Sequence, residues 1–259
     1  MRILLVMLFL LMPVPAFAWG AQGHEIIATI AARQLTARAG AQVARLLGSP
    51  AMLIHDSNWA DEVRDRRPET GPWHYVDIPL AAPAYVPGRD CAGGQCVVAQ
   101  ISRARQTLAD SQQPAAKRAE ALRFLIHLVA DLHQPLHAAD DGDRGGNDVR
   151  INLNGRPTNL HQLWDTRMVE VLGTDSQAVA ADIAGAVSPA QRKSCQAGTP
   201  ASWADESHRL ARERVYPIVK GRRSLRLSAG YLRAETPAIR QQLAKGGTRL
   251  AWLLNTSLR

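Results

Sequence analysis

The chain has 259 residues, a formal net charge of +8 and a hydrophobic content of 46%. This length can form one large domain with a substantial core, and the absence of repeats, low-complexity segments and linkers excludes a repeat array or two separated domains. The positive charge favours an acidic partner such as nucleic acid or an anionic surface, although charge alone does not decide between them.

Residues 1–18, MRILLVMLFLLMPVPAFA, are typical of a secretory signal peptide. Arg2 supplies a positive start, an apolar run follows, and Ala16-Phe17-Ala18 is a small-x-small cleavage site. We therefore expect cleavage before Trp19, a mature domain of residues 19–259, and secretion into the periplasm or the medium. The alternative is an uncleaved amino-terminal anchor. No later stretch has the length and apolar character of a membrane span.

The rest of the chain reads mostly as helix. Apolar periodicity and capping residues predict helices over residues 24–35, 57–65 (with Ser57 as cap), 97–110, 114–133 (with Pro114 in the first turn), 202–219 and 235–255. Short alternating runs about Asn154-Gly155 predict a β-hairpin over residues 147–160. Residues 81–96 and 140–148 read as loops. The expected fold is therefore mainly α, a single helical domain with a small β-hairpin.

Three cysteines would lie in an oxidising compartment. Cys91 and Cys96 flank a short Ala-Gly-Gly-Gln loop and are candidates for a local disulfide, which would leave Cys195 unpaired. Their spacing does not exclude a bridge from Cys195 to either of the other two.

The stretch FLIHLVADLHQPLH, residues 124–137, places histidines and an aspartate among packing residues. His127 and Asp131 are four apart and share one helix face, which is ligand spacing for a metal ion. Pro135 ends the helix, so His137 lies beyond the break. In NLHQLWD, His161 and Asp165 repeat the four-residue spacing.

Further candidate ligands precede these pairs: His24, Asp61 and His74. Any single histidine on a helix is more often a packed or solvated residue than a ligand. Two His-x-x-x-Asp pairs in apolar helices, with three more candidates, are different, because burying so many imidazoles and carboxylates without a metal would be costly. Ligation by histidine and aspartate without cysteine favours catalytic zinc.

These motifs, taken in order, resemble those of the zinc-dependent single-strand-specific nucleases, the nuclease S-one and P-one type. The resemblance covers nearly the whole mature chain and is carried by WGAQGH, WADEVR, WHYVDIP, FLIHLVADLHQPLH, GGND, NLHQLWD and GGTRLAWLLN. It implies the fold shared with phospholipase C, a bacterial member, a monomer without an obligate protein partner, and three Zn²⁺ ions per chain.

The resemblance also implies which residues hold each ion. The first would take Asp61, His74, His127 and Asp131. The second would take the free amine and carbonyl of Trp19, His24 and the other oxygen of Asp131, and the third would take His137, His161 and Asp165. The remaining motif histidine, His133, has no ligand role in the family and is expected to be structural. Among the cysteines, only the Cys91–Cys96 loop matches the family.

The activity implied is endonucleolytic hydrolysis of single-stranded DNA and RNA to 5′-phosphate products, with 3′-nucleotidase activity. A zinc-bound hydroxide would attack phosphorus in line, with Asp61, Asp131 and Arg64 as catalytic residues. Arg64 stands where many relatives carry lysine, so it keeps the charge that contacts phosphate but changes its geometry. Alternatively, Arg64 is a solvated surface residue.

Substrate-binding residues are implied in the same way. Tyr75 would stack on a nucleobase, Asp77 would hydrogen-bond the edge of the base, and Asn147 would make a further base contact. Stacking tolerates any base and requires an unstacked one, which suits a nuclease that acts on single strands. Alternatively, Tyr75 is a core aromatic.

Two other functions fit part of the pattern. A zinc-dependent phospholipase C has the same fold, but its first histidine lies further from the amino-terminal tryptophan, and its last ligand is glutamate where this chain has Asp165. The third possibility is a zinc-stabilised protein that binds nucleic acid without cleaving it. Activity measured before and after chelation separates this protein from an enzyme.

Overall fold

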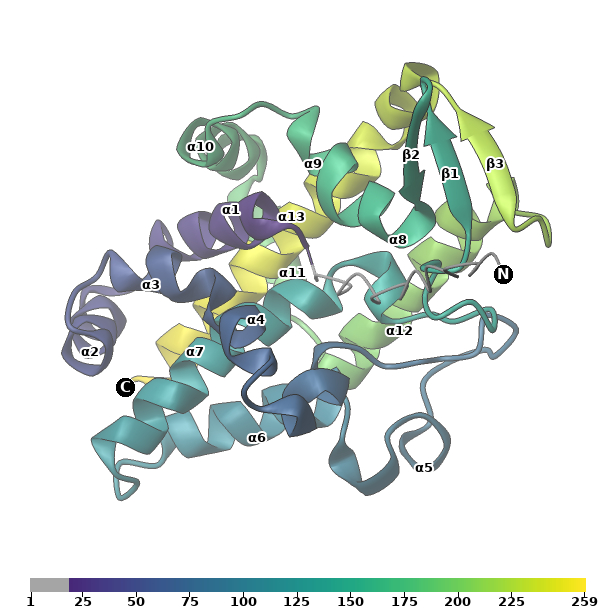
Figure 1. Cartoon of the computed structure of the whole chain (residues 1–259). Helices are drawn as coiled ribbons and strands as arrows, with labels where there is room; N and C mark the ends of the chain where they lie inside the picture. The colour runs from purple at the N-terminus through teal and green to yellow at the C-terminus, as the bar shows by residue number, and fades with distance from the viewer. Residues whose placement is uncertain (1–18) are drawn as a thin grey trace, which may run out of the picture.

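The computed structural model of the chain describes residues 19–259 and is mainly α-helical (Figure 1). The expected signal peptide, residues 1–18, with its cleavage site lies outside the described range. The longer helices are α1 (Ala21–Ala32), α2 (Ala37–Leu47), α6 (Val97–Ala109), α7 (Ala115–Leu132), α10 (Ser176–Ala186), α12 (Pro200–Leu210) and α13 (Ala229–Ser257). The shorter ones are α3 (Met52–His55), α4 (Trp59–Arg64), α5 (Pro87–Asp90), α8 (Leu160–Gln162), α9 (Met168–Glu170) and α11 (Pro189–Cys195). Within the described range the mainly α class is therefore confirmed.

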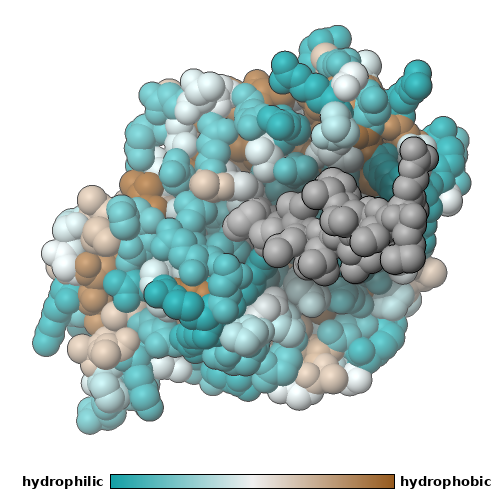
Figure 2. All heavy atoms as spheres, in the orientation of Figure 1, coloured by the Kyte–Doolittle hydropathy of each residue, from teal (hydrophilic) through white to brown (hydrophobic). Residues whose placement is uncertain are grey.

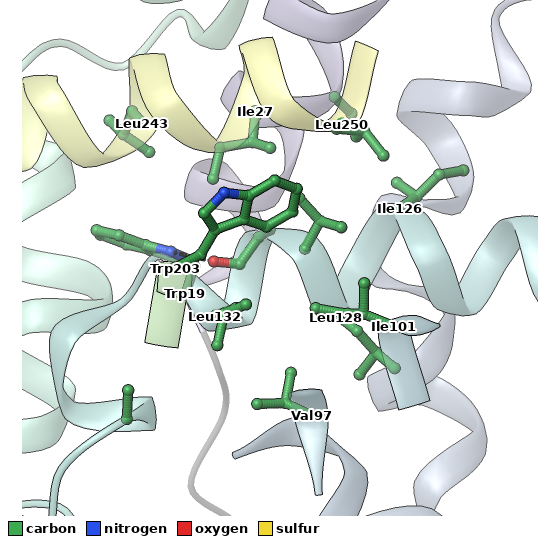
Figure 3. Packing of buried hydrophobic residues seen from close by; sticks show 14 of the residues in the cluster. Trp19, Ile27, Val97, Ile101, Ile126, Leu128, Leu132, Trp203, Leu243 and Leu250 are labelled. Carbon is green, nitrogen blue, oxygen red and sulfur yellow. Dashed lines mark hydrogen bonds between the residues drawn. The ribbon is translucent and has the colours of Figure 1, made fainter. Parts of the chain in front are cut away.

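Helix α7 lies at the centre of the helical layer and packs against α6, α13, α1 and α12. Figure 3 shows apolar side chains from these helices pointing into a common interior, among them Ile27 of α1, Ile101 of α6, Leu128 of α7 and Leu250 of α13. All four are buried. Burial on this scale fixes α7, and with it the candidate ligands that α7 carries.

Helices α1 and α13 approach each other closely at Gly247. A β-carbon placed on Gly247 would lie 2.4 Å from Cγ2 of Ile30, a distance that atoms in contact do not adopt. Only glycine therefore allows the two helix backbones to pack at this separation. The motif GGTRLAWLLN thus has a packing role in the last helix.

The small sheet has the order β2-β1-β3. Strands β1 (Arg150–Leu153) and β2 (Arg156–Asn159) form the expected antiparallel hairpin about Asn154-Gly155, and the Asn152 side chain accepts a hydrogen bond from Gly155 N. The third strand, β3 (Ser224–Leu227), pairs with β1 in parallel and was not predicted. Its segment is short and follows a helical stretch, so local periodicity gives no sign of a strand.

Several boundaries differ from the sequence-based expectations. Ser57 does not cap a helix: it lies buried inside a 3₁₀ turn, Asp56–Asn58, that leads into α4. Pro114 is the cap residue before α7, not a residue of its first turn. The helix expected over residues 202–219 changes after Leu210 into a π-helical turn, Ala211–Val215, and then a 3₁₀ turn, Tyr216–Ile218. Helices α2, α10 and α11 were not predicted.

Cys91 and Cys96 form a disulfide, as expected, and Cys195 is free.

No helix among residues 19–259 combines the length and the apolar character needed to cross a membrane. The face seen in Figure 2 is largely hydrophilic, with smaller hydrophobic patches between.

Candidate metal centre

Helix α7 supplies two of the candidate ligands from its buried carboxyl-terminal half. His127 and Asp131 lie one turn apart, and His127 Nε2 is 3.3 Å from Asp131 Oδ2. The helix ends at Leu132, and a 3₁₀ turn, Pro135–His137, redirects the chain after the proline. His137 therefore points to a different group of candidate ligands, as the proline suggested.

The first group contains Asp61, His74 and His127, whose candidate ligand atoms all lie within 4.8 Å of one another. His127 Nε2 and His74 Nδ1 are 3.1 Å apart, and each lies 3.7 Å from an oxygen of Asp61. His74 Nδ1 is also 3.0 Å from Asp131 Oδ2. Three chain segments, α4, the end of a 3₁₀ turn and α7, thus meet at one point.

The second group contains His24, His127 and Asp131, so it shares His127 with the first. His24 Nε2 of α1 lies 3.1 Å from Asp131 Oδ1, so the two carboxylate oxygens face different sets of histidines. Trp19 is fixed beside this group, because its buried indole donates a hydrogen bond from Nε1 to the carbonyl of Ala130. The backbone N–H of Gly20 donates to the carbonyl of Asp165.

The third group contains His137, His161 and Asp165, all buried. His137 Nε2 and His161 Nε2 are 3.1 Å apart, and His161 Nε2 lies 3.2 Å from Asp165 Oδ2. Asp165 belongs to a π-helical turn, Leu163–Arg167, that continues α8. The carbonyl of Gly145 accepts a hydrogen bond from His161 Nδ1, and the positive φ of 59° at Gly145 favours glycine there.

The donor set fits a metal ion, because lone pairs face each other in the interior. His137 Nδ1 donates to the carbonyl of His74, and His161 Nδ1 donates to that of Gly145, so both Nε2 atoms at 3.1 Å present lone pairs. Two facing lone pairs repel unless a cation lies between them. Among the described residues, His24 Nδ1, Asp61 Oδ1 and His74 Nε2 are also buried without a hydrogen-bond partner.

Electrostatics favour the metal-binding forms of His161 and Asp131. Burial, together with the neighbouring His137, lowers the pKa of His161 to about 3. Burial alone would raise the pKa of the Asp131 carboxyl, but His127 and the hydrogen bonds to it hold that pKa well below its usual range. Neutral imidazoles and an ionised carboxylate are the forms that bind a divalent cation.

Two other candidate ligands favour a bound proton that a metal ion would displace. Burial opposes protonation of His127, yet the carboxylates of Asp131 and Asp61 raise its pKa to about 9. At Asp165, burial raises the pKa of the carboxyl well above its usual range, only partly offset by a hydrogen bond from Gln134. Both raised pKa values mean that these groups favour their protonated forms without a metal, and that a bound cation would replace the two protons.

Comparison of the sequence with known proteins assigns the chain to a family. The family model described as S1/P1 Nuclease matches residues 19–259. The chain belongs to this family. Endonuclease 2 of Arabidopsis thaliana is 31% identical over 92% of this chain and 89% of its own length. Nuclease P1 of Penicillium citrinum is 30% identical over 92% of this chain and 97% of its own length, and Endonuclease 4 of Arabidopsis thaliana is 31% identical over 93% and 89%. Membership makes the chain a nuclease, a hydrolase of nucleic acids.

In this S1/P1 family member, the expected base-binding residues lie at the surface beside the ligand groups. Tyr75, which directly follows His74, is 40% exposed and is not a core aromatic. Asp77 is also exposed at one edge, and partial burial together with Asp140 raises the pKa of its carboxyl to about 6. The Asn147 amide donates to the carbonyl of Arg144, which leaves its own oxygen available.

Arg64, the expected phosphate contact, lies one turn after Asp61 on α4. Its guanidinium is half-buried and comes within 3.8 Å of Asp61 Oδ1. This position next to the first ligand group puts a fixed positive charge at the rim of the site, so Arg64 is not simply a solvated surface residue.

His133, expected to be structural, lies in none of the three groups. Its Nδ1 donates to the carbonyl of Val129, and its Nε2 accepts from the guanidinium of Arg249 on α13. Burial and the nearby Arg249 charge lower the pKa of His133 to about 3, so the ring stays neutral. It joins the last helix to α7.

Sequence reasoning missed the residues that orient the ligands. The Ser57 carbonyl accepts a hydrogen bond from His127 Nδ1 at 2.8 Å, and the Gln134 amide donates to Asp165. Such partners fix the ring orientation of a metal-binding histidine. Backbone carbonyls leave no trace in the residue type, but Gln134 lies inside HQPLH, where its polar side chain in an apolar stretch was a usable signal.

Proposed function

We propose that the chain is a secreted zinc-dependent endonuclease that hydrolyses single-stranded DNA and RNA to products with 5′-phosphates, and that also removes the phosphate of 3′-nucleotides. Family membership supports the nuclease activity. The single observation that carries the rest is the meeting of three histidine–aspartate groups beside an exposed aromatic residue, Tyr75. Release into the periplasm or the medium follows from the signal-like residues 1–18.

Nine residues would hold three zinc ions. Asp61, His74, His127 and Asp131 would hold the first, Trp19, His24 and Asp131 the second, and His137, His161 and Asp165 the third. When bound, the ions supply a water nucleophile at neutral pH and charge stabilisation for the oxygens of the phosphate. Asp131 suits the shared position because its two oxygens already face different histidines.

The residues around the groups would place the substrate. Tyr75 offers an exposed ring on which any base can stack, so it selects for unpaired strands and not for sequence. Asp77 and Asn147 offer acceptors for the edge of that base. Arg64 places its guanidinium next to Asp61, where it would hold a phosphate oxygen and stabilise the charge that develops in the transition state.

The decisive experiment incubates the purified, processed protein in parallel with single-stranded DNA and with phosphatidylcholine, before and after chelation. We expect cleavage of the DNA, products that carry 5′-phosphates, and loss of activity with the chelator that zinc restores. Hydrolysis of the lipid alone would identify a phospholipase C. Binding of DNA without any cleavage would identify a nucleic-acid-binding protein, and products with 3′-phosphates would overturn the assignment of the leaving oxygen.

A further inference from the structure

The positive charge of the chain is concentrated in two segments that the site does not use. Residues 150–159 and 220–226 together contain six arginines and lysines and no aspartate or glutamate, against a formal net charge of +8 for the whole chain. The first segment is the hairpin of β1 and β2, and the second runs into β3. Segments so rich in one sign of charge usually face an oppositely charged partner.

The sheet brings these segments together on one face. Arg150 is paired with Ser224, and Asn152 with Arg226, while Ile151 and Leu225 between them are buried. The exposed side of the sheet therefore presents Arg150 and Arg226 with asparagine and serine as neighbours. The two arginines lie two residues apart on adjacent strands, about 8 Å from each other by strand geometry.

Three of these basic side chains have no acidic partner within the described part of the protein. In the part of the chain that the structure describes, Arg150, Arg226 and Lys220 form no ion pair, and all three are exposed. The carboxylates nearest to Arg150 in sequence have other partners: Asp148 binds Arg144 at 2.9 Å, and Asp143 accepts from the Tyr216 hydroxyl and lies 3.8 Å from Arg223. Unpaired cations repel one another, so this face gains stability only from an anionic partner.

The charged face begins where the candidate site ends. Arg150 follows the expected base contact Asn147 by three residues, a reach of no more than about 11 Å. Strand β2 ends at Asn159, which caps the helix that carries His161. The Arg223 guanidinium donates to the carbonyl of Gly142, which ties the start of β3 to the same loop. The sheet is thus a continuous extension of the loop beside the third ligand group.

We infer that the exposed face of this sheet binds the phosphate backbone of the substrate strand beyond the nucleotide held at Tyr75, with Arg150 and Arg226 on successive phosphates. This inference rests on the proposed function. Asn152 and Ser224 between the arginines add neutral donors that tolerate any sequence. Contacts with phosphate alone carry no base specificity, which suits a nuclease that cuts strands regardless of sequence.

The test uses the processed, zinc-loaded protein and a double variant, Arg150→Thr with Arg226→Thr, since threonine suits an exposed strand position. The matched control removes two exposed arginines from α2, Arg38→Gln with Arg45→Gln, which form no ion pair among residues 19–259 and lie across the molecule from the sheet in Figure 1. KM is measured at several salt concentrations for a dinucleotide and for a long single-stranded DNA. A dinucleotide is too short to span Tyr75 and the sheet.

We expect the sheet variant to raise KM for the long strand severalfold over the control, and to reduce the salt slope by about 0.7 for each lost phosphate contact. Both variants should cleave the dinucleotide equally, which also shows that they are folded. Equal KM values for the long strand in the two variants would overturn the inference. If the sheet variant loses binding to phosphatidylglycerol vesicles while its DNA kinetics match the control, the face is a membrane-binding surface instead. Failure of the unmodified protein to cleave the dinucleotide would refute the proposed function itself.

Discussion

His137 Nε2 lies 3.1 Å from His161 Nε2, while the other nitrogen of each ring donates to a backbone carbonyl. Neither ring has a hydrogen to place between them. The protein therefore holds two acceptors in contact inside a buried site, an arrangement that is unfavourable by itself and favourable around a cation. The metal-free protein should carry this cost as lost stability.

Removal of metal should lower the thermal stability of the protein. A ligand present at a thousandfold excess over its dissociation constant stabilises the folded state by about 4 kcal/mol, which corresponds to roughly 10 °C in Tm for a chain of this size. Calorimetry with chelator, and again after zinc is restored, measures this. An unchanged Tm in the chelated protein, with metal shown to be absent, would mean that the groups fold without a cation.

Asp131→Asn should reduce zinc content more than any other single ligand change. The two oxygens of Asp131 face His24 and His74, so their loss weakens two ions, whereas His161→Ala should remove only the third. Elemental analysis of both variants decides this, with exposed Asp182→Asn as control. Equal zinc loss from Asp131→Asn and His161→Ala would contradict the shared role of Asp131.

Tyr75→Ala should weaken substrate binding and leave the metal content unchanged. Stacking of a base on an aromatic ring contributes roughly 1–3 kcal/mol, a fivefold to hundredfold change in KM for short substrates. Tyr75→Phe keeps the ring and should retain nearly all affinity. If Tyr75→Ala binds dinucleotides as well as the unchanged protein does, base stacking occurs elsewhere.

The ion pairs of Glu206 should make stability depend on pH in the acid range. Burial would raise the pKa of Glu206, but Arg249 and Lys245 lower it from 4.5 to about 2. Because the folded pKa is depressed, this stabilisation is complete above the unfolded value and is lost as pH falls toward 2. The difference in Tm between the unchanged protein and Glu206→Gln should stay constant from pH 6 down to the unfolded pKa of 4.5 and shrink from there to pH 3. A constant difference over this range would show that the charge of Glu206 does not contribute.

Removal of every residue before Trp19 should be required for full activity. An added methionine would displace the free amine of Trp19, while the indole of Trp19 and Gly20 N keep their own contacts with Ala130 and Asp165. We expect the Met-extended protein to fold, to lack one zinc ion and to lose most activity. The comparison uses equal concentrations and excess zinc, and three ions with full activity in the extended protein would refute ligation by the terminal amine.

Part of the ligand groups could be predicted from local pattern, because some of their residues break a local rule. His127 and Asp131 are polar residues on a buried helix face, and Pro135 marks where the chain turns toward His137. The turn dipeptide Asn154-Gly155 likewise fixed the hairpin. In each case the signal is local, within a few residues of the element that it predicts.

The parts that sequence reasoning missed depend on distant partners. Strand β3 exists because Leu225 pairs with Ile151, more than seventy positions earlier, and its own periodicity is too short to predict a strand. The orientation of His127 depends on the carbonyl of Ser57, which any residue type would supply equally. Ser57 itself was assigned to a helix cap because its side chain suits that role, but tertiary packing buried it instead.

The close approach of Gly247 to Ile30 has a consequence for the time at which the site forms. Helix α13 follows every other described element along the chain, yet it packs along α1, which carries His24 near its start. During synthesis, α3, α7 and α10 become available to α1 first, and the contact with α13 can form only when the last helix emerges. A chain cut or stalled before Gly247 would lack this contact, so α1 and the His24 that it carries would be held by fewer partners until the last helix is made.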